Sequence, residues 1–244
     1  MSEPATPRPA STIILLRDRP AGLQIFLVVR HHEIDFASGA LVFPGGRMEP
    51  ADLELAAALG DDDPALGLRI AAIREAFEEC GVLFARARGE AGLVSAERAR
   101  ALDRSIPFAE RLARENLAPA VDRLVPFAHW ITPAFLPKRF DTWFFLALAP
   151  PDQALAHDGR EAVDSVWISP REALHGRFKL LFPTERNLWK LAAHADAASA
   201  FAAARAAPVV TVLPEPVQVD GGPGLKIPAE AGYGGEAFSV RGLV

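Results

Sequence analysis

The stretch that decides the fold is "REAFEECGV", residues 74–82, read together with "GALVFPGG", residues 39–46. The first stretch continues an apolar pattern of helical spacing and ends at Gly81, and glycine is common just beyond a helix C-terminus. The second stretch is a short apolar run that ends in a Pro-Gly-Gly turn. Together they predict a strand and turn at 39–46, and a helix at 65–81 whose last turns carry three glutamates.

The three glutamates, Glu75, Glu78 and Glu79, are predicted to project from one helix face, because residues three and four positions apart are neighbours on a helix. Such a cluster is either a solvated face or a site for a hard divalent cation such as Mg²⁺, which prefers oxygen ligands and commonly bridges to phosphates. The turn at Gly45 and Gly46 favours the second interpretation, since glycine lets the backbone approach a phosphate or a metal closely.

The composition excludes several classes of protein. The chain has 244 residues and a net charge of -5, and it lacks the basic block expected for nucleic-acid binding. Its one cysteine, Cys80, rules out an intrachain disulfide and fits a reducing compartment. No apolar run reaches the roughly 18 residues of a membrane span. We therefore expect a cytoplasmic protein that binds neither nucleic acid nor membrane.

The pattern along the chain predicts a single domain over residues 11–244, preceded by a flexible leader over residues 1–10. Apolar and β-branched runs predict strands at 11–18, 23–32, 39–43, 142–149, 162–169 and 209–213. Helical periodicity and caps predict helices at 50–59, 65–81, 169–174 and 183–205. The segment at about 85–128 is rich in alanine, arginine and glutamate, and we interpret it as a helical insertion.

The segments "PGGRMEPAD" and "REAFEECGV" resemble the signature of the Nudix hydrolases, and the matching positions are Gly46, Arg74, Glu75, Glu78, Glu79, Gly81 and Val82. The sequence has Asp52 where the family has glutamate, and twenty-one residues, 53–73, where the family has a spacer of seven. The resemblance implies an α+β fold, the Nudix α/β/α sandwich with a mixed β-sheet. It also implies Mg²⁺ or Mn²⁺ bound by the glutamates and Gly46, with Asp52 and Arg74 as structural partners of the site.

The split signature and the segment "WITPAFLPKRFDTWFFL", residues 130–146, are similar to the Nudix branch that includes the peroxisomal coenzyme A diphosphatases. This similarity implies a metal-dependent pyrophosphohydrolase that cleaves a nucleoside diphosphate linked to another group, with coenzyme A or acyl-CoA as the first expectation. The alternative is a non-catalytic, nucleotide-binding Nudix module that acts as a sensor or partner surface. The expected partner is a small nucleoside diphosphate derivative, and a homodimer is compatible with the family.

Further candidate residues flank the predicted strands. Glu161 precedes the strand at 162–169 and resembles the extra ligand or base of some family members, although it fits an exposed loop position equally well. Arg30 ends the second strand, where it either approaches the substrate phosphates or lies in a surface loop. Arg139 either binds a phosphate with its planar fork or pairs with Asp141. Trp143 is either a base-stacking or a core residue.

The roles of the carboxylates stay open at this point. Glu78 or Glu79 is the first choice for a metal ligand, and Glu161 or Glu75 is the first choice for the general base. The four together, Glu75, Glu78, Glu79 and Glu161, form the predicted catalytic set.

Overall fold

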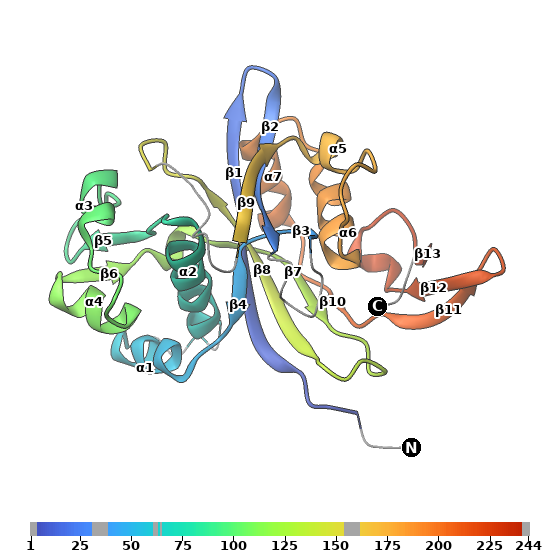
Figure 1. The fold of residues 1–244 in the computed structure, drawn as a ribbon, viewed down its shortest axis with the longest axis horizontal. Coiled ribbons are helices and arrows are strands. Elements are labelled where there is room, and N and C mark those ends of the chain that lie inside the picture. The colour runs from blue at the N-terminus through green and yellow to red at the C-terminus, as the bar shows by residue number, and fades with distance from the viewer. Residues whose placement is uncertain (1–3, 31–38, 61–62, 64, 154–161, 241–244) are drawn as a thin grey trace.

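The computed structural model describes residues 4–30, 39–60, 63, 65–153 and 162–240. Its centre is a mixed eight-stranded sheet (Figure 1). The main path runs, in spatial order, through β10 (Thr211–Val212), β7 (Val125–Ile131), β8 (Phe140–Leu148), β1 (Arg8–Arg19), β2 (Gly22–Arg30) and β3 (Leu41–Val42). Two further strands lie off this path, since β4 (Gly45–Arg47) pairs with β1 and β9 (Ala162–Ile168) pairs with β2. The β1–β8 and β10–β7 pairs are parallel.

The sheet separates two apolar cores, as the alternation of side chains along β1 shows. Ile13 and Leu15 belong to the core beneath α2 (Leu66–Cys80), whereas Ile14 and Leu16 belong to the core on the opposite face. That opposite face is covered by α5 (Pro170–Ala173), α6 (Phe182–Leu191) and α7 (Ala197–Ala206) (Figure 1). The chain therefore folds as the α/β/α sandwich that the family resemblance implies, with α2 on the face that carries the candidate site.

Strand β1 begins earlier than the sequence pattern indicates. Arg8, Pro9 and Ala10 continue the parallel ladder to β8, and Ala10 also pairs with Arg47 of β4. The prediction of a flexible leader over residues 1–10 is therefore wrong for residues 8–10. The sequence pattern does not indicate a strand at Pro9, because proline lacks a backbone N–H donor and usually argues against a strand.

The segment predicted as a helical insertion at 85–128 is only partly helical. It contains two short helices, α3 (Ala96–Ala101) and α4 (Phe108–Arg114), and a two-stranded sheet of β5 (Ala85–Ala87) and β6 (Leu117–Pro119). The 3₁₀ turn η1 (Val121–Arg123) follows, and residues 125–128 already belong to β7. Phe108 and Leu112 of α4 join the core beneath α2, so the insertion packs against the helix that bears the glutamates.

The predicted long helix at 183–205 is two helices, α6 and α7. Helix α6 ends at Leu191, and Asp196 starts α7 by accepting a hydrogen bond from the Ser199 backbone N–H at 2.8 Å. Alanine-rich sequence on both sides of the break favours helix, and for that reason the sequence pattern predicts one continuous helix. The aspartate satisfies a free backbone donor at the start of α7 and thereby fixes the break.

The chain beyond residue 213 forms a small antiparallel sheet that the sequence did not predict. It consists of β11 (Glu215–Val219), β12 (Gly222–Lys226) and β13 (Ala237–Ser239), with the 3₁₀ turn η2 (Ala229–Ala231) before β13. Tyr233 anchors this region: its hydroxyl accepts a hydrogen bond from Trp130 Nε1 at 3.1 Å and donates one to Asn187 Oδ1 at 2.8 Å. Burial raises the pKa of Tyr233 well above its usual value.

The helices of the described ranges are all too short or too polar to be candidates for crossing a membrane.

Replacing Tyr233 with Phe removes one hydroxyl that serves two buried partners. We expect the free energy of unfolding to fall by about 2 kcal/mol, because Trp130 Nε1 and Asn187 Oδ1 are then left buried without their hydrogen bonds. Urea unfolding monitored by circular dichroism measures the change. An unchanged unfolding midpoint would show that these hydrogen bonds do not hold the C-terminal region to the sheet.

Candidate active site

Helix α1 (Pro50–Ala58) presents Asp52 to the interior of the site. Pro50 occupies the first helical position, where its missing N–H costs nothing, and Asp52 lies in the first turn. The Asp52 carboxylate accepts a hydrogen bond from the Glu49 backbone N–H at 2.8 Å, and the residue is only 2% exposed. A buried carboxylate of this kind requires a cationic partner, since an isolated charge in the interior is costly.

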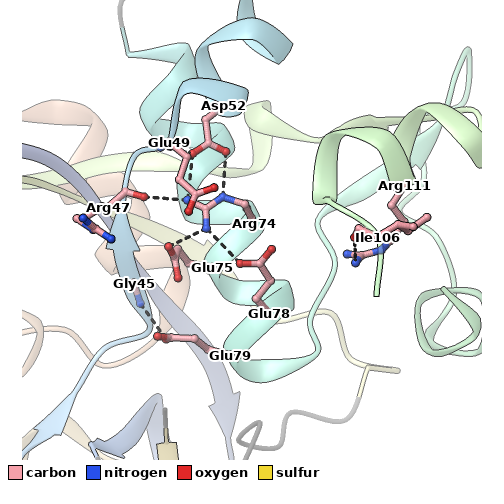
Figure 2. Close-up of polar contacts among 10 residues, drawn as sticks. All are labelled: Gly45, Arg47, Glu49, Asp52, Arg74, Glu75, Glu78, Glu79, Ile106 and Arg111. Carbon is pink, nitrogen blue, oxygen red and sulfur yellow. Dashed lines mark hydrogen bonds and ion pairs between the residues drawn. The ribbon is translucent and has the colours of Figure 1, made fainter. Parts of the chain in front are cut away.

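Arg74 of α2 is that partner, and it is the centre of the site (Figure 2). Its Nε and Nη2 donate to the two oxygens of Asp52 at 3.1 and 3.0 Å. Nη2 also donates to the Arg47 carbonyl at 2.8 Å, which ties β4 to α2. Burial acts to lower the pKa of Arg74, but Asp52 and the neighbouring glutamates outweigh it and raise that pKa overall.

The remaining nitrogen of Arg74 orients two of the glutamates. Nη1 donates to Glu75 Oε1 at 2.9 Å and to Glu78 Oε2 at 3.1 Å. Glu79 points to the glycine turn instead, where its Oε2 accepts a hydrogen bond from the Gly45 backbone N–H at 3.0 Å (Figure 2). One guanidinium group and one turn therefore set the directions of all three carboxylates.

Gly46 is required because the Glu75 carboxylate occupies the place of a side chain. A Cβ at position 46 would lie 2.3 Å from Glu75 Oε1 and 2.6 Å from its carboxyl carbon. The backbone of β4 and the Glu75 carboxylate thus meet in van der Waals contact. The sequence predicts that this turn approaches a phosphate or a metal, whereas the group that lies against it in the structure is the Glu75 carboxylate.

The electrostatics of the site are those of excess negative charge. Three carboxylates, those of Asp52, Glu75 and Glu78, accept hydrogen bonds from the one guanidinium group of Arg74, and the Glu79 carboxylate lies at the glycine turn of the same site. Partial burial raises the pKa of Glu78 above its usual range; the charge of Arg74 opposes this shift and the charge of Glu49 adds to it. A bound cation would offset this repulsion.

The donor set fits a hard divalent cation, because it consists of carboxylate oxygens, and the backbone at Gly46 lies in van der Waals contact with one of those carboxylates, that of Glu75. Within the described ranges, however, no three acidic, histidine or cysteine side chains are gathered in metal-binding geometry. The glutamates are turned towards Arg74 and Gly45, so their role as metal ligands remains a prediction.

Three further residues that the sequence singled out, Arg30, Glu161 and Arg139, have different outcomes. Arg30 is the last residue of β2 and pairs with Ala162 of β9. Glu161 lies outside the described residues. Arg139 donates to the carbonyls of Thr132 and Ala5 at 3.0 and 2.8 Å, so the alternative in which it pairs with Asp141 is wrong, and its role towards substrate remains a prediction.

Asp141 pairs instead with His129 of β7. His129 Nε2 bonds Asp141 Oδ1, and Nδ1 lies 2.9 Å from Thr211 Oγ1. The Trp143 ring stacks on His129 with centroids 4.4 Å apart, which makes Trp143 a partly buried packing residue. These residues come from β7, β8 and β10, and only the strand register brings them together.

Arg111 of α4 is a second residue that the sequence did not indicate. Its guanidinium group extends from the insertion towards α2 (Figure 2) and lies 5.0 Å from the Phe77 ring centroid. It donates to the carbonyls of Asp103 and Ile106. Its charge interacts with that of Glu78, so the insertion contributes to the electrostatics of the acidic face, which is the face of α2 that carries Glu75, Glu78 and Glu79.

Comparisons with known proteins find similar sequences and a similar fold. A family model described as the NUDT19 Nudix domain matches residues 54–189. The human acyl-coenzyme A diphosphatase NUDT19 is 31% identical over 229 residues, which covers 70% of this chain and 59% of that protein. Nudix hydrolase 7 of Caenorhabditis elegans is 30% identical over 176 residues, covering 69% of this chain and 55% of that protein. The chain thus spans little more than half the length of these relatives.

Among solved structures, a Nudix hydrolase from Alicyclobacillus acidocaldarius superposes with a TM-score of 0.68 at 27% identity. The match covers 81% of this chain and 96% of the other. The agreement extends over most of the sandwich and is therefore a property of the whole fold rather than of the glutamate-bearing helix alone.

Replacing Arg74 with Met leaves Asp52 as a buried, unpaired charge. We expect the free energy of unfolding to fall by about 3–5 kcal/mol. The double substitution D52N/R74M also removes the unpaired charge of Asp52, and it should recover part of the lost free energy of unfolding. Urea unfolding of the two variants makes the comparison, and a double variant no more stable than R74M would show that the ion pair is not the source of the effect.

Replacing Gly46 with Ala forces the Glu75 carboxylate away from β4. We expect a loss of about 1–3 kcal/mol in the free energy of unfolding, as for other overpacked sites. Gly92→Ala is the matched control, because nothing lies within 4 Å of the added methyl group. Thermal unfolding of both variants measures the difference. Equal stabilities would mean that the Glu75 carboxylate can move away from β4 without lowering the free energy of unfolding.

Proposed function

The chain belongs to the Nudix hydrolase family, with a NUDT19-type Nudix domain, and on that premise we propose that it is a metal-dependent diphosphatase acting on nucleoside diphosphate derivatives. The observation that carries the proposal is the arrangement in which one buried arginine directs Glu75 and Glu78 beside the glycine turn. A module that only bound nucleotides would not require so many carboxylates against a single buried cation.

The reaction is hydrolysis of a phosphoric anhydride. The oxygen of a water molecule forms a bond to one phosphorus atom, and the bridging P–O bond breaks. The proton released by the water passes to a carboxylate, for which Glu75 is the leading candidate among the described residues, since Arg74 and Gly46 hold it in place. The two products each carry a terminal phosphate.

A Mg²⁺ or Mn²⁺ ion is the cofactor that this family typically requires, and Glu78, Glu79 and the Gly46 backbone are the groups that would hold it. Such an ion neutralises charge on the diphosphate oxygens and lowers the pKa of a coordinated water. Glu78 and Glu79 lie three and four positions after Glu75, so each is a neighbour of Glu75 on α2, and both would be available to one ion beside Glu75 once their present partners are exchanged.

Coenzyme A or an acyl-CoA is the substrate class that we put first. The support is the human relative named acyl-coenzyme A diphosphatase, together with the similarity of residues 130–146 to that branch. Cleavage of coenzyme A at its diphosphate gives 4′-phosphopantetheine and adenosine 3′,5′-bisphosphate. ADP-ribose, NADH and dinucleoside polyphosphates are the competing substrates that an assay must include.

A panel of these diphosphates, assayed with Mg²⁺, with Mn²⁺ and with EDTA, tests the proposal directly. We expect hydrolysis with either metal, none with EDTA, and the highest kcat/KM for coenzyme A or an acyl-CoA. Product analysis by liquid chromatography identifies the bond cleaved. Tight binding without hydrolysis of any compound would favour the non-catalytic module, and a preference for another diphosphate would overturn the substrate assignment alone.

Replacing Glu79 with Gln tests the acidic cluster. We expect turnover to fall by about a hundredfold or more, because the amide keeps the shape and loses the charge of the carboxylate. The melting temperature should change by less than about 2 °C, since no large apolar contact is lost. Exposed Glu97 of α3 provides the control, and E97Q should retain full activity. Full turnover in E79Q would remove Glu79 from the mechanism.

A further inference from the structure

Ser11 is a fully buried polar residue and the fourth residue of β1. It is 0% exposed, and its hydroxyl has no hydrogen-bond partner among the described residues. A buried hydroxyl without a partner destabilises a fold, because it loses its hydrogen bonds to water and gains none in return. Its neighbours on the same face of the strand, Ile13 and Leu15, are both apolar core residues. Packing alone would therefore favour a small apolar residue such as alanine at position 11.

The strand register places Ser11 beside the candidate site. Ser11 is paired with Gly46 of β4 on one side and with Trp143 of β8 on the other. Directly paired residues in a sheet project from the same face. Ser11 shares its face with Ile13, and this is the face covered by α2. The hydroxyl thus lies on the side of the sheet that carries Arg74 and the glutamates.

The Glu75 carboxylate lies next to Ser11, in the place that a side chain of its paired residue Gly46 would fill. A Cβ at position 46 would lie 2.3 Å from Glu75 Oε1, so the carboxylate stands where the side chain of residue 46 would be. Side chains of directly opposed residues have Cβ atoms about 4.5–5.5 Å apart. Ser11 and the Glu75 carboxylate consequently occupy adjacent places in one row across the sheet, with no side chain on Gly46 between them.

We propose that the Ser11 hydroxyl and the Glu75 carboxylate together bind one water molecule when the site is filled, and that Ser11 is a positioning residue for the attacking water. The water donates one hydrogen bond to Glu75 and the other to Ser11 Oγ. Its oxygen lone pair is then free to face the phosphorus atom. This inference rests on the proposed diphosphatase function and adds to it a residue outside the family signature.

The unpartnered hydroxyl gives the proposal an unusual prediction, because stability and activity should move in opposite directions. Ser11→Ala removes the buried polar group, so the metal-free protein should melt about 2–4 °C higher. The same substitution should lower kcat by about tenfold or more while KM stays within about twofold, because a misdirected water slows the chemical step. A purely structural role for Ser11 would lower both stability and activity.

The matched control is Thr12→Val, which removes a hydroxyl from the next residue of the same strand. Thr12 pairs with Gly45 and points to the opposite face of the sheet from Ser11. We expect T12V to keep the kcat of the wild type. Mn²⁺ titrations followed by electron paramagnetic resonance should give the same affinity for S11A as for the wild type, which separates a water-binding role from metal binding.

The outcomes distinguish this inference from the proposed function. A wild-type protein that hydrolyses no diphosphate overturns both. An active wild type with an unchanged kcat in S11A overturns the role of Ser11 alone, and so does a rise in KM without a change in kcat. A lower melting temperature of metal-free S11A would show that the hydroxyl is satisfied within the fold, and it would likewise overturn the inference.

Discussion

The site depends on the burial of one guanidinium group. Arg74 is 5% exposed, and its nitrogens reach Asp52, Glu75, Glu78 and the Arg47 carbonyl. An arginine in this position can hold its place only because the surrounding acceptors satisfy its donors, and the carboxylates can lie close together only because it separates them. The pairing joins α1, α2 and β4 into one unit. Arg74 therefore sets the directions of Glu75 and Glu78 in the ligand-free protein.

The sandwich supplies the frame for that unit. Strand β1 pairs with β8 over residues 8–16 on one edge, and with β4 over residues 10–12 and β2 over residues 16–19 on the other, so β4 is held to the sheet through β1. Helix α2 crosses the same face and packs on Ile13 and Leu15. The insertion then covers the outer side of α2, where Arg111 approaches Phe77. The chain between Asp52 and Arg74 includes the rest of α1 and the first turns of α2, and the pair still forms.

Local sequence was sufficient for what depends on local chemistry. Helix α2 and its end at Gly81 follow from periodicity and from the properties of glycine, whereas the contact of Gly46 with the Glu75 carboxylate was not predicted. Contacts that depend on strand register could not be predicted: Asp141 turned to His129 rather than to Arg139, and Ser11 came to lie opposite Gly46. The small C-terminal sheet was missed for the same reason, because Tyr233 is held by partners that are 103 and 46 positions away. A polar side chain such as that of Asp196 can end a helical pattern that composition alone would continue.

The central claim is that the acidic face of α2 binds the divalent ion on which hydrolysis depends. Anomalous diffraction from crystals soaked with Mn²⁺ and a slowly hydrolysed diphosphate analogue tests it most directly. The account predicts an anomalous peak in direct contact with carboxylate oxygens from at least two of Glu75, Glu78 and Glu79, and with an oxygen of the diphosphate. A peak bound only by other residues, or a diphosphate bound with no ion at α2, would contradict it.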